Sequence, residues 1–157
     1  MSVIRIASVI HGDPAIARQI HAVQMRAYAQ EAALLGATWF PPLERTVEDV
    51  QSSKEHFLAA RADGRIAGAI GVEPDPEGLG ITIASLVVDP CFQRQGMGRK
   101  LLEAVLAAHG DAGLTVQTGA RNAPALALYE AKGFVVTRRW LVGREPLELV
   151  RLRRLPD

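Results

Sequence analysis

The segment from Ile81 to His109 constrains the fold more than any other part of the sequence. It reads ITIASLVV, then DPCFQRQGMGRK, then LLEAVLAAH. The first part is a nearly continuous apolar run of eight residues, which predicts a central strand covered on both faces of a sheet. A helix is expected from about Gly98 to His109, with its apolar residues on one side and Gly110 as its stop. A buried strand must therefore run through a glycine-containing turn directly into a helix.

This turn has the properties of an anion site. Gly96 and Gly98 leave backbone N–H groups unobstructed, and a helix N-terminus carries roughly half a positive charge. It is not a nucleoside-triphosphate loop, because the GxxxxGK[ST] pattern is absent. Nor is it a dinucleotide fingerprint, because GxGxxG requires a glycine where this chain has Leu101. The glycines alone are equally compatible with an ordinary strand-to-helix turn.

The rest of the chain alternates strand patterns with helix patterns. Further strands are expected at 3–7, 56–62, 65–72, 114–118, 134–142 and 147–155. Further helices are expected from Asp13-Pro14 to Gly36, after a Thr46 cap, and from Pro124 to Gly133. Adjacent prolines in segment 38–44 indicate that no regular structure forms there. Strands interleaved with helices predict a single α/β or α+β three-layer domain over residues 1–157.

Composition excludes several classes of protein. The chain has 18 Lys and Arg against 17 Asp and Glu, a net charge of +1 that predicts no nucleic-acid partner. Cys91 is the single cysteine, which favours a reducing, cytoplasmic location. The first 13 residues do not resemble a signal peptide, and no apolar run approaches the roughly 20 residues of a membrane-spanning helix. The four histidines lack paired metal-ligand spacing, so we expect no metal.

Two motifs, correctly ordered along the chain, resemble those of the GNAT superfamily of acyl-CoA-dependent N-acyltransferases. The first is the Q-x-x-G-x-G turn, with Gln93, Gly96 and Gly98 at its signature positions. The second, N-x-x-A-x-x-L-Y-E-x-x-G-F, begins at Asn122 and ends at Phe134. The expected element order is similar to that of the family over nearly the whole chain. The sequence is therefore identified as a member of this superfamily.

This resemblance implies a mixed, mostly antiparallel seven-stranded sheet with helices on both faces. Its fourth and fifth strands are parallel and splay apart near a bulge. The resemblance also implies an N-acetyltransferase, in which acetyl-CoA and a primary amine bind together and the amine attacks the thioester directly. A non-catalytic CoA-binding regulatory or interaction module is the alternative.

The resemblance also implies which residues contact acetyl-CoA. The pantetheine arm would bind the backbone of Leu86, Val87 and Val88 in the gap between the splayed strands. The pyrophosphate would bind the turn and helix start, formed by Gln93, Arg94, Gln95, Gly96, Met97, Gly98, Arg99 and Lys100. Asn122 matches a family position that often contacts the cofactor, although a plain helix cap explains it equally well.

The reaction needs an acid and a base. Tyr129 stands at the family's general-acid position, where its phenol could protonate the departing CoA thiolate, although it could instead be a core tyrosine. The strand position at which some relatives carry a glutamate base is Thr82 here, which rules out a carboxylate there. Glu73 is the nearest alternative base, and a water held by backbone carbonyls and Ser85 is the other.

The acceptor is less constrained. The family's acceptor region would correspond to Trp39, Phe40, Glu44, Trp140 and Gly143-Arg144, where the two aromatic residues of TWFPP could wall an amine pocket or simply staple the chain to the core. A small-molecule amine, a peptide N-terminus and a protein lysine remain open. Cys91 has no neighbouring histidine, so a nucleophilic role is not expected. The apolar LELV run could pair two copies into a homodimer.

Overall fold

The computed structural model describes residues 3–157, so the first two residues of the predicted domain lie outside it. Its strands are β1 (Arg5–Ser8), β2 (His56–Ala62), β3 (Arg65–Pro74), β4 (Ile81–Val88), β5 (Leu114–Gly119), β6 (Val135–Val142) and β7 (Leu147–Arg154). Its α-helices are α1 (Pro14–Leu35), α2 (Val47–Gln51), α3 (Met97–His109) and α4 (Ala123–Ala131), and two short 3-10 helices are η1 (Pro41–Glu44) and η2 (Pro90–Phe92). Within the described range, no helix combines the length and the apolarity needed to cross a membrane.

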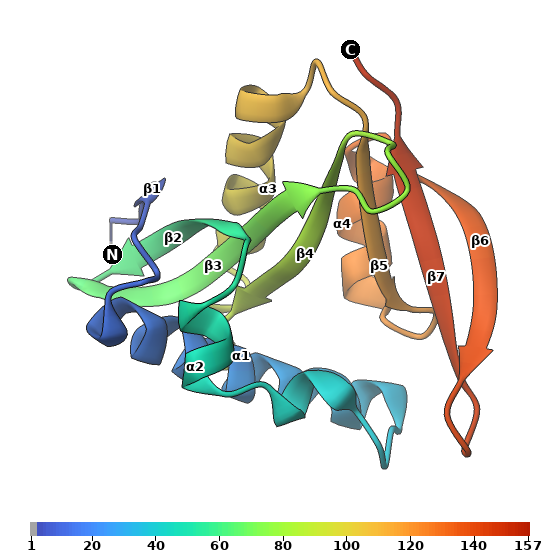
Figure 1. The fold of residues 1–157 in the computed structure, drawn as a ribbon, viewed down its shortest axis with the longest axis horizontal. Helices are drawn as coiled ribbons and strands as arrows, with labels where there is room; N and C mark the ends of the chain where they lie inside the picture. Colours follow the sequence, from blue (N-terminus) through green and yellow to red (C-terminus); the bar gives the residue numbers. More distant parts are fainter. Residues whose placement is uncertain (1–2) are drawn as a thin grey trace.

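All seven strands belong to one sheet with the order β1-β2-β3-β4-β5-β7-β6. Neighbouring strands are antiparallel except β4 and β5, which are parallel (Figure 1). The predicted mixed, mostly antiparallel sheet is therefore confirmed. It follows from the connections, because hairpin turns join β2 to β3 and β6 to β7, whereas α3 carries the chain across from β4 to β5.

Local signals in the sequence set most helix boundaries. Asp13 accepts a hydrogen bond from the Ala15 amide and starts α1, and Gly36 ends it in a left-handed conformation. Thr46 and Asp49 form the reciprocal capping box that starts α2. These boundaries agree with the expected ones.

Two expectations need correction. The first strand runs from Arg5 to Ser8 rather than from position 3, because its register is set by pairing with β2. Segment 38–44 was expected to lack regular structure, yet Pro41–Glu44 forms the 3-10 helix η1. Proline tolerates the first positions of a helix, because the N–H that it lacks would have no partner there.

The helices cover both faces of the sheet (Figure 1). On one face, Ile20 and Val23 of α1 and Val50 of α2 pack with Phe57 and Val87. On the other face, the core contains side chains of α3 and α4, among them Leu101, Leu102, Val105 and Tyr129. The sheet thus separates two cores, as a three-layer domain requires.

The strands β4 and β5 diverge along their length. They pair only from Ile81 to Ile83 and from Leu114 to Val116, and beyond this point they separate (Figure 1). In the same region Ile83 pairs with Val72 of β3, whereas Ser85 pairs with Gly71, so Ala84 is an extra, bulged residue. The predicted splayed pair is therefore confirmed.

Candidate functional site

A cavity of about 420 Å³ occupies the gap between β4 and β5. We call it the central cavity. Its walls come from both splayed strands, from α1 and η1 on one face of the sheet, from α4 on the other, and from the β6–β7 hairpin. Its lining residues include Tyr28, Glu31, Trp39, Phe40, Ser85, Leu86, Asn122, Tyr129 and Leu147. The cavity is largely apolar, with a few polar groups directed into it, which is typical of small-molecule sites.

Tyr129 enters the central cavity from α4. Its ring packs against Phe134 with the centroids 5.4 Å apart, and its side chain is only 4% exposed. Burial, together with the Glu31 carboxylate and Tyr28, raises the pKa of Tyr129 well above its ordinary value. The phenol is therefore neutral at physiological pH and retains a proton that it can donate.

Glu31 faces the same cavity from α1. Asn122 donates a hydrogen bond from Nδ2 to Glu31 Oε1 over 3.2 Å, and a second to Thr118 Oγ1 over 3.3 Å. Asn122 also caps α4, because its Oδ1 accepts from the Ala125 amide. Burial raises the pKa of Glu31, although the hydrogen bond from Asn122 opposes this shift. Asn122 is thus both a helix cap and a cavity residue.

Ser85 lies at the bulge of β4, where its hydroxyl donates to Glu55 Oε2 over 2.7 Å. The Glu55 carboxylate is 5% exposed and is paired with Arg45 at 2.5 Å, while Ser53 donates to the same carboxylate at 2.8 Å. Arg45 in turn reaches Gln24, whose buried Nε2 has no hydrogen-bond partner among the described residues. A buried polar network therefore underlies one wall of the cavity.

The backbone of β4 beyond Ile83 has no partner strand on its β5 side. Leu86 and Val88 pack into the core beneath α3, whereas Val87 faces α1. Because these side chains are engaged in packing, the groups that Leu86, Val87 and Val88 present to the gap are backbone N–H and C=O. An extended ligand could add to this open edge as a further strand.

The turn after β4 exposes the start of α3. Gly96 is the N-cap in a left-handed conformation, with φ of 75°, and no side chain caps the helix. The Lys100 amide bonds to the Gly96 carbonyl, so the amides of Met97, Gly98 and Arg99 precede the first intrahelical bond. Arg94, Gln95, Arg99 and Lys100 are exposed around this end. The arrangement provides backbone donors and positive charge for an anion.

Two contacts fix this turn against α1. Gln93 donates to Gln30 over 2.5 Å, and Arg26 pairs with the buried Asp89 over 2.5 Å. Met97 is 1% exposed and packs in the core, so it offers the turn only its backbone amide. Among the predicted cofactor residues, Gln93 and Met97 therefore have side chains with structural partners.

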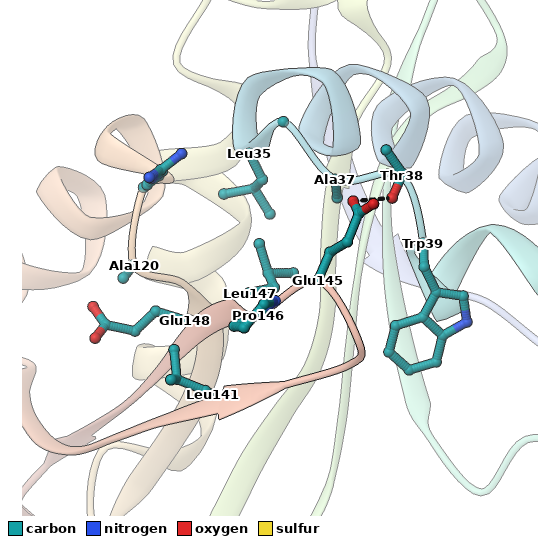
Figure 2. Close-up of a pocket in the computed structure, with 12 residues that line it drawn as sticks. Leu35, Ala37, Thr38, Trp39, Ala120, Leu141, Glu145, Pro146, Leu147 and Glu148 are labelled. Carbon is teal, nitrogen blue, oxygen red and sulfur yellow. Dashed lines mark hydrogen bonds between the residues drawn. The ribbon is translucent and has the colours of Figure 1, made fainter.

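A second cavity, of about 350 Å³, adjoins the first and shares Trp39 and Leu147 with it. We call it the outer cavity. Figure 2 shows Thr38, in the segment after α1, and Glu145, in the β6–β7 turn, joined by a hydrogen bond. The oxygen atoms of this bond are 2.6 Å apart. Glu148 also lines this space, and Trp39 lies next to the Gly143 backbone. Of the residues predicted for the acceptor region, Trp39 lines both cavities and Phe40 lines the central one. The others, Glu44, Trp140, Gly143 and Arg144, line neither, although the Gly143 backbone adjoins Trp39.

The remaining candidates lie away from the central cavity. Glu73 pairs with Thr82 where β3 meets the closed end of β4, and neither residue lines the cavity. Near Glu73, Asp75 is buried and bonded to Arg151 over 2.6 Å, which makes this acidic stretch structural. Cys91 is exposed beside the turn. Residues 3–157 contain no group of three or more His, Cys, Asp or Glu side chains arranged to hold a metal ion.

Sequence patterns did not point to three residues in or beside the central cavity, namely Tyr28, Glu31 and Glu55. Tyr28 and Glu31 are one helical turn apart on α1, within a pattern that shows only an amphipathic helix. Burial raises the pKa of Tyr28 to about 12, and the Arg45 guanidinium opposes this shift. Glu55 precedes a strand and carries no local motif. The one available signal in α1 was that Tyr28 and Glu31 are polar residues on the helix face that packs against the sheet.

Comparison with known proteins agrees with this geometry. Residues 53–136, just over half of the chain, match the family model described as an acetyltransferase (GNAT) domain. The protein YqkA of Bacillus subtilis is 40% identical over 125 residues, which are 79% of this chain but only 36% of YqkA. The chain thus spans about a third of that relative's length.

Two further known proteins are matched over more of their own length. The N-alpha-acetyltransferase RimI of Mycobacterium tuberculosis is 36% identical over 123 residues, covering 69% of this chain and 73% of RimI. The solved structure of yncA from Salmonella typhimurium, which contains its cofactor acetyl-CoA, superposes with a TM-score of 0.69 at 21% identity. It covers all of this chain and 95% of the yncA chain, so the two proteins share a fold.

Proposed function

This chain belongs to the GNAT acetyltransferase family, and from that membership we propose that it transfers an acetyl group from acetyl-CoA to a primary amine. The proposal takes residues 1–157 as one catalytic domain. The observation that carries it is the coincidence, in one cavity, of an open β4 edge, an uncapped α3 N-terminus nearby, and a buried, neutral tyrosine.

The described residues fit acetyl-CoA in two places. The free backbone edge at Leu86, Val87 and Val88 suits the amide groups of a pantetheine arm, which would bind like an added strand. The amides from Gln93 to Gly98 suit a pyrophosphate, with Arg94, Arg99 and Lys100 exposed beside them to supply positive charge. When bound, this cosubstrate supplies an acetyl group activated as a thioester.

Tyr129 is the proposed general acid. A CoA thiolate has a pKa near that of a cysteine, about 8.5, so a neutral phenol can protonate it as it departs. Burial keeps the Tyr129 phenol neutral, so its proton is available to the departing sulfur, although the same raised pKa makes this phenol a weaker acid than an exposed tyrosine. Asn122 is proposed to hold the start of α4, and thereby Tyr129, against α1.

The acceptor is proposed to enter between η1 and the β6–β7 hairpin. Trp39 is 53% exposed there, and Phe40 packs edge-on against Tyr28 with the centroids 6.3 Å apart. Aromatic walls of this kind can hold an amine. The relative RimI is named an N-alpha-acetyltransferase, which makes a peptide N-terminus one candidate acceptor.

The proposal is tested in two stages. Thermal unfolding is measured with acetyl-CoA, CoA or ATP, and we expect both CoA compounds, but not ATP, to raise the melting temperature. Thiol release from acetyl-CoA is then followed with phenethylamine, spermidine, N-acetyl-lysine amide and an alanine-initiated hexapeptide. Stabilisation by CoA without turnover of any amine would instead favour a non-catalytic CoA-binding module. Stabilisation by ATP alone would contradict both functions.

A further inference from the structure

Glu31 is half-buried and differs in its partners from the fully buried carboxylates near the two faces of the sheet. Asp75, Asp89 and Glu55 each pair with an arginine at 2.5 or 2.6 Å. Glu31 takes part in none of the ion pairs found among residues 3–157, and its side chain accepts a hydrogen bond from the neutral amide of Asn122. A carboxylate in a largely apolar cavity is costly unless a positive charge compensates it. A cationic group on a ligand would compensate the charge of Glu31.

The position of Glu31 connects its negative charge with the proposed acetyl transfer. Glu31 lines the same cavity as Tyr129, and its carboxylate charge helps raise the pKa of that tyrosine. The outer cavity adds two further carboxylates, Glu145 and Glu148, and one cation, Arg121. Glu145 is bonded to Thr38 and Glu148 is paired with Arg139, so neither reaches into the central cavity as Glu31 does.

We propose that Glu31 binds the acceptor in its ammonium form and removes the proton that the nitrogen must lose before it can attack. This inference rests on the proposed acetyl transfer. A primary alkyl amine has a pKa of about 10.4 and is almost wholly protonated at pH 7, so some group must deprotonate it. Glu31 lies in the cavity, whereas Glu73 lies outside it. Ser85 already donates its hydroxyl hydrogen to Glu55.

The proton balance closes with Glu31 and Tyr129 alone. One ammonium proton passes to the Glu31 carboxylate and is later released to solvent. The nitrogen lone pair then forms the C–N bond to the acetyl carbon as the C–S bond breaks, and the sulfur takes the phenol proton of Tyr129. Tyr129 recovers a proton from the nitrogen as the amide forms. The net reaction converts ammonium and thioester into amide, thiol and one proton.

The titratable groups around Glu31 support this role. Tyr28 on the same helix and Tyr129 on α4 face it, and the Arg45–Glu55 pair lies behind Tyr28. Burial makes Glu31 a stronger base than an exposed carboxylate, which brings its pKa closer to that of the ammonium. Neither tyrosine can serve as the base near neutral pH, because the pKa of each lies above its ordinary value.

The test compares Glu31→Gln with Glu48→Gln, an exposed glutamate on α2 outside both cavities. Calorimetry of the CoA-loaded protein at pH 7 measures the affinity for phenethylamine and for 2-phenylethanol, its uncharged analogue. We expect wild type and Glu48→Gln to prefer the amine by about 10-fold or more, and Glu31→Gln to lose that preference. CoA affinity should be the same in all three proteins.

Kinetics provide the second readout. With acetyl-CoA and phenethylamine, Glu31→Gln should lower kcat/KM by roughly 100-fold or more at pH 7, and its rate should rise with the fraction of free amine up to pH 10. Glu31→Asp should restore part of the activity.

Two results would overturn the proposal. One is an amine preference that is absent in wild type or retained in Glu31→Gln. The other is a normal kcat/KM in Glu31→Gln combined with a loss in Ser85→Ala, which would assign the proton to a Ser85-bound water. Failure of the proposed function looks different, since wild type would then show no turnover of any amine while the calorimetric preference still reports on Glu31.

Discussion

Ser85 and Glu55 are 30 positions apart in sequence, yet the hydroxyl of Ser85 donates to the buried Glu55 carboxylate over 2.7 Å. The bond joins the bulge of β4 to the loop that precedes β2. Glu55 also holds Arg45, which follows η1, so three segments around the central cavity meet at one carboxylate. A Cβ added at Gly71 would lie 2.0 Å from Glu55 Oε2, which shows how tightly the sheet surface fits this group.

Removal of Glu55 should therefore destabilise the fold. Glu55→Ala leaves the Arg45 guanidinium and the Ser85 hydroxyl without their shared partner, so we expect a loss of about 3 to 5 kcal/mol in the free energy of unfolding, measured in urea. Ser85→Ala should cost less, about 1 to 3 kcal/mol, because Arg45 and Ser53 still satisfy Glu55. Glu48→Ala, at an exposed position, serves as the control. Equal stabilities of all variants would show that the network is dispensable.

Tyr129→Phe should separate chemistry from binding. The ring still packs on Phe134, so we expect little change in stability or in acetyl-CoA affinity, while kcat falls by roughly 10 to 1000-fold. Thiol-release kinetics and calorimetry measure the two effects. Tyr28→Phe is the matched control, since Tyr28 is the other tyrosine and lines the same cavity. A larger loss in Tyr28→Phe than in Tyr129→Phe would move the acid role to Tyr28.

Gly98→Ala should report on phosphate binding with little effect on the fold. A Cβ at this position would lie 3.7 Å from Val88 and 3.8 Å from Leu128, which are ordinary contacts. Alanine is also a better helix former than glycine, so the melting temperature should stay equal or rise. We expect CoA affinity to fall by about 10-fold, because the methyl group separates the backbone amides from a pyrophosphate. Gly12→Ala, where an added Cβ meets nothing within 4 Å, controls for the substitution itself.

Acid should weaken the fold partly through Asp75. Burial would raise the pKa of this carboxyl, but hydrogen bonds from the Leu79 amide, Thr115 and Arg151 more than compensate and lower it. The folded state thus binds fewer protons than the unfolded state, so this stabilisation is present above about pH 4 and is lost as pH falls through the lowered pKa.

Asp75→Asn should remove that pH dependence. We expect a loss of about 3 kcal/mol in the free energy of unfolding at pH 7, because the buried Arg151 loses its close carboxylate partner and keeps only the longer pair with the exposed Glu77 at 3.5 Å. The difference from wild type should be smaller at pH 3. Urea unfolding at the two pH values measures both effects. Asp111→Asn, at an exposed position, should follow wild type at both. A constant difference between Asp75→Asn and wild type would show that Asp75 does not titrate in this range.

Sequence patterns predicted the fold wherever one residue governs a local choice. Asp13 and Gly36 bound α1 through their own side-chain and backbone chemistry, and Asp63-Gly64 turns β2 into β3 with both residues at positive φ. The position of β1 and the 3-10 form of Pro41–Glu44 depend instead on what packs or pairs with them. Alternation alone could not reveal the Ala84 bulge, because β4 is a nearly continuous apolar run and its two polar residues, Thr82 and Ser85, do not define an alternating pattern.

The candidate site likewise contains residues that motifs predicted and residues that only the packing of the fold brings in. Motif spacing led to Gly96, Gly98, Asn122 and Tyr129, which the fold gathers around one gap, although their roles remain predictions. Glu31 lines the cavity and Glu55 holds Ser85 of its wall, and neither belongs to a motif. The packing of α1 and of the loop before β2 against the sheet brings them there. Their importance follows from burial and from which partner each one has, and both are properties of the folded chain.

The single extra residue at Ala84 has a consequence for how β4 can vary. Before it, odd-numbered positions such as Ile83 point to the α3 side; after it, Ser85 and Val87 point to the α1 side. The side of the sheet to which the odd-numbered residues of β4 point is therefore reversed halfway along the strand. Deleting Ala84 would remove the bulge and leave the later residues on their present sides, because Ile83 and Ser85 already pair with the adjacent residues Val72 and Gly71. Drawing Ala84 into regular alternation would instead exchange the two sides for every later position, directing Leu86 and Val88 towards Glu55 and Ser85 into an apolar core. The bulge, more than the identity of most residues of β4, decides which layer of the molecule each later side chain serves.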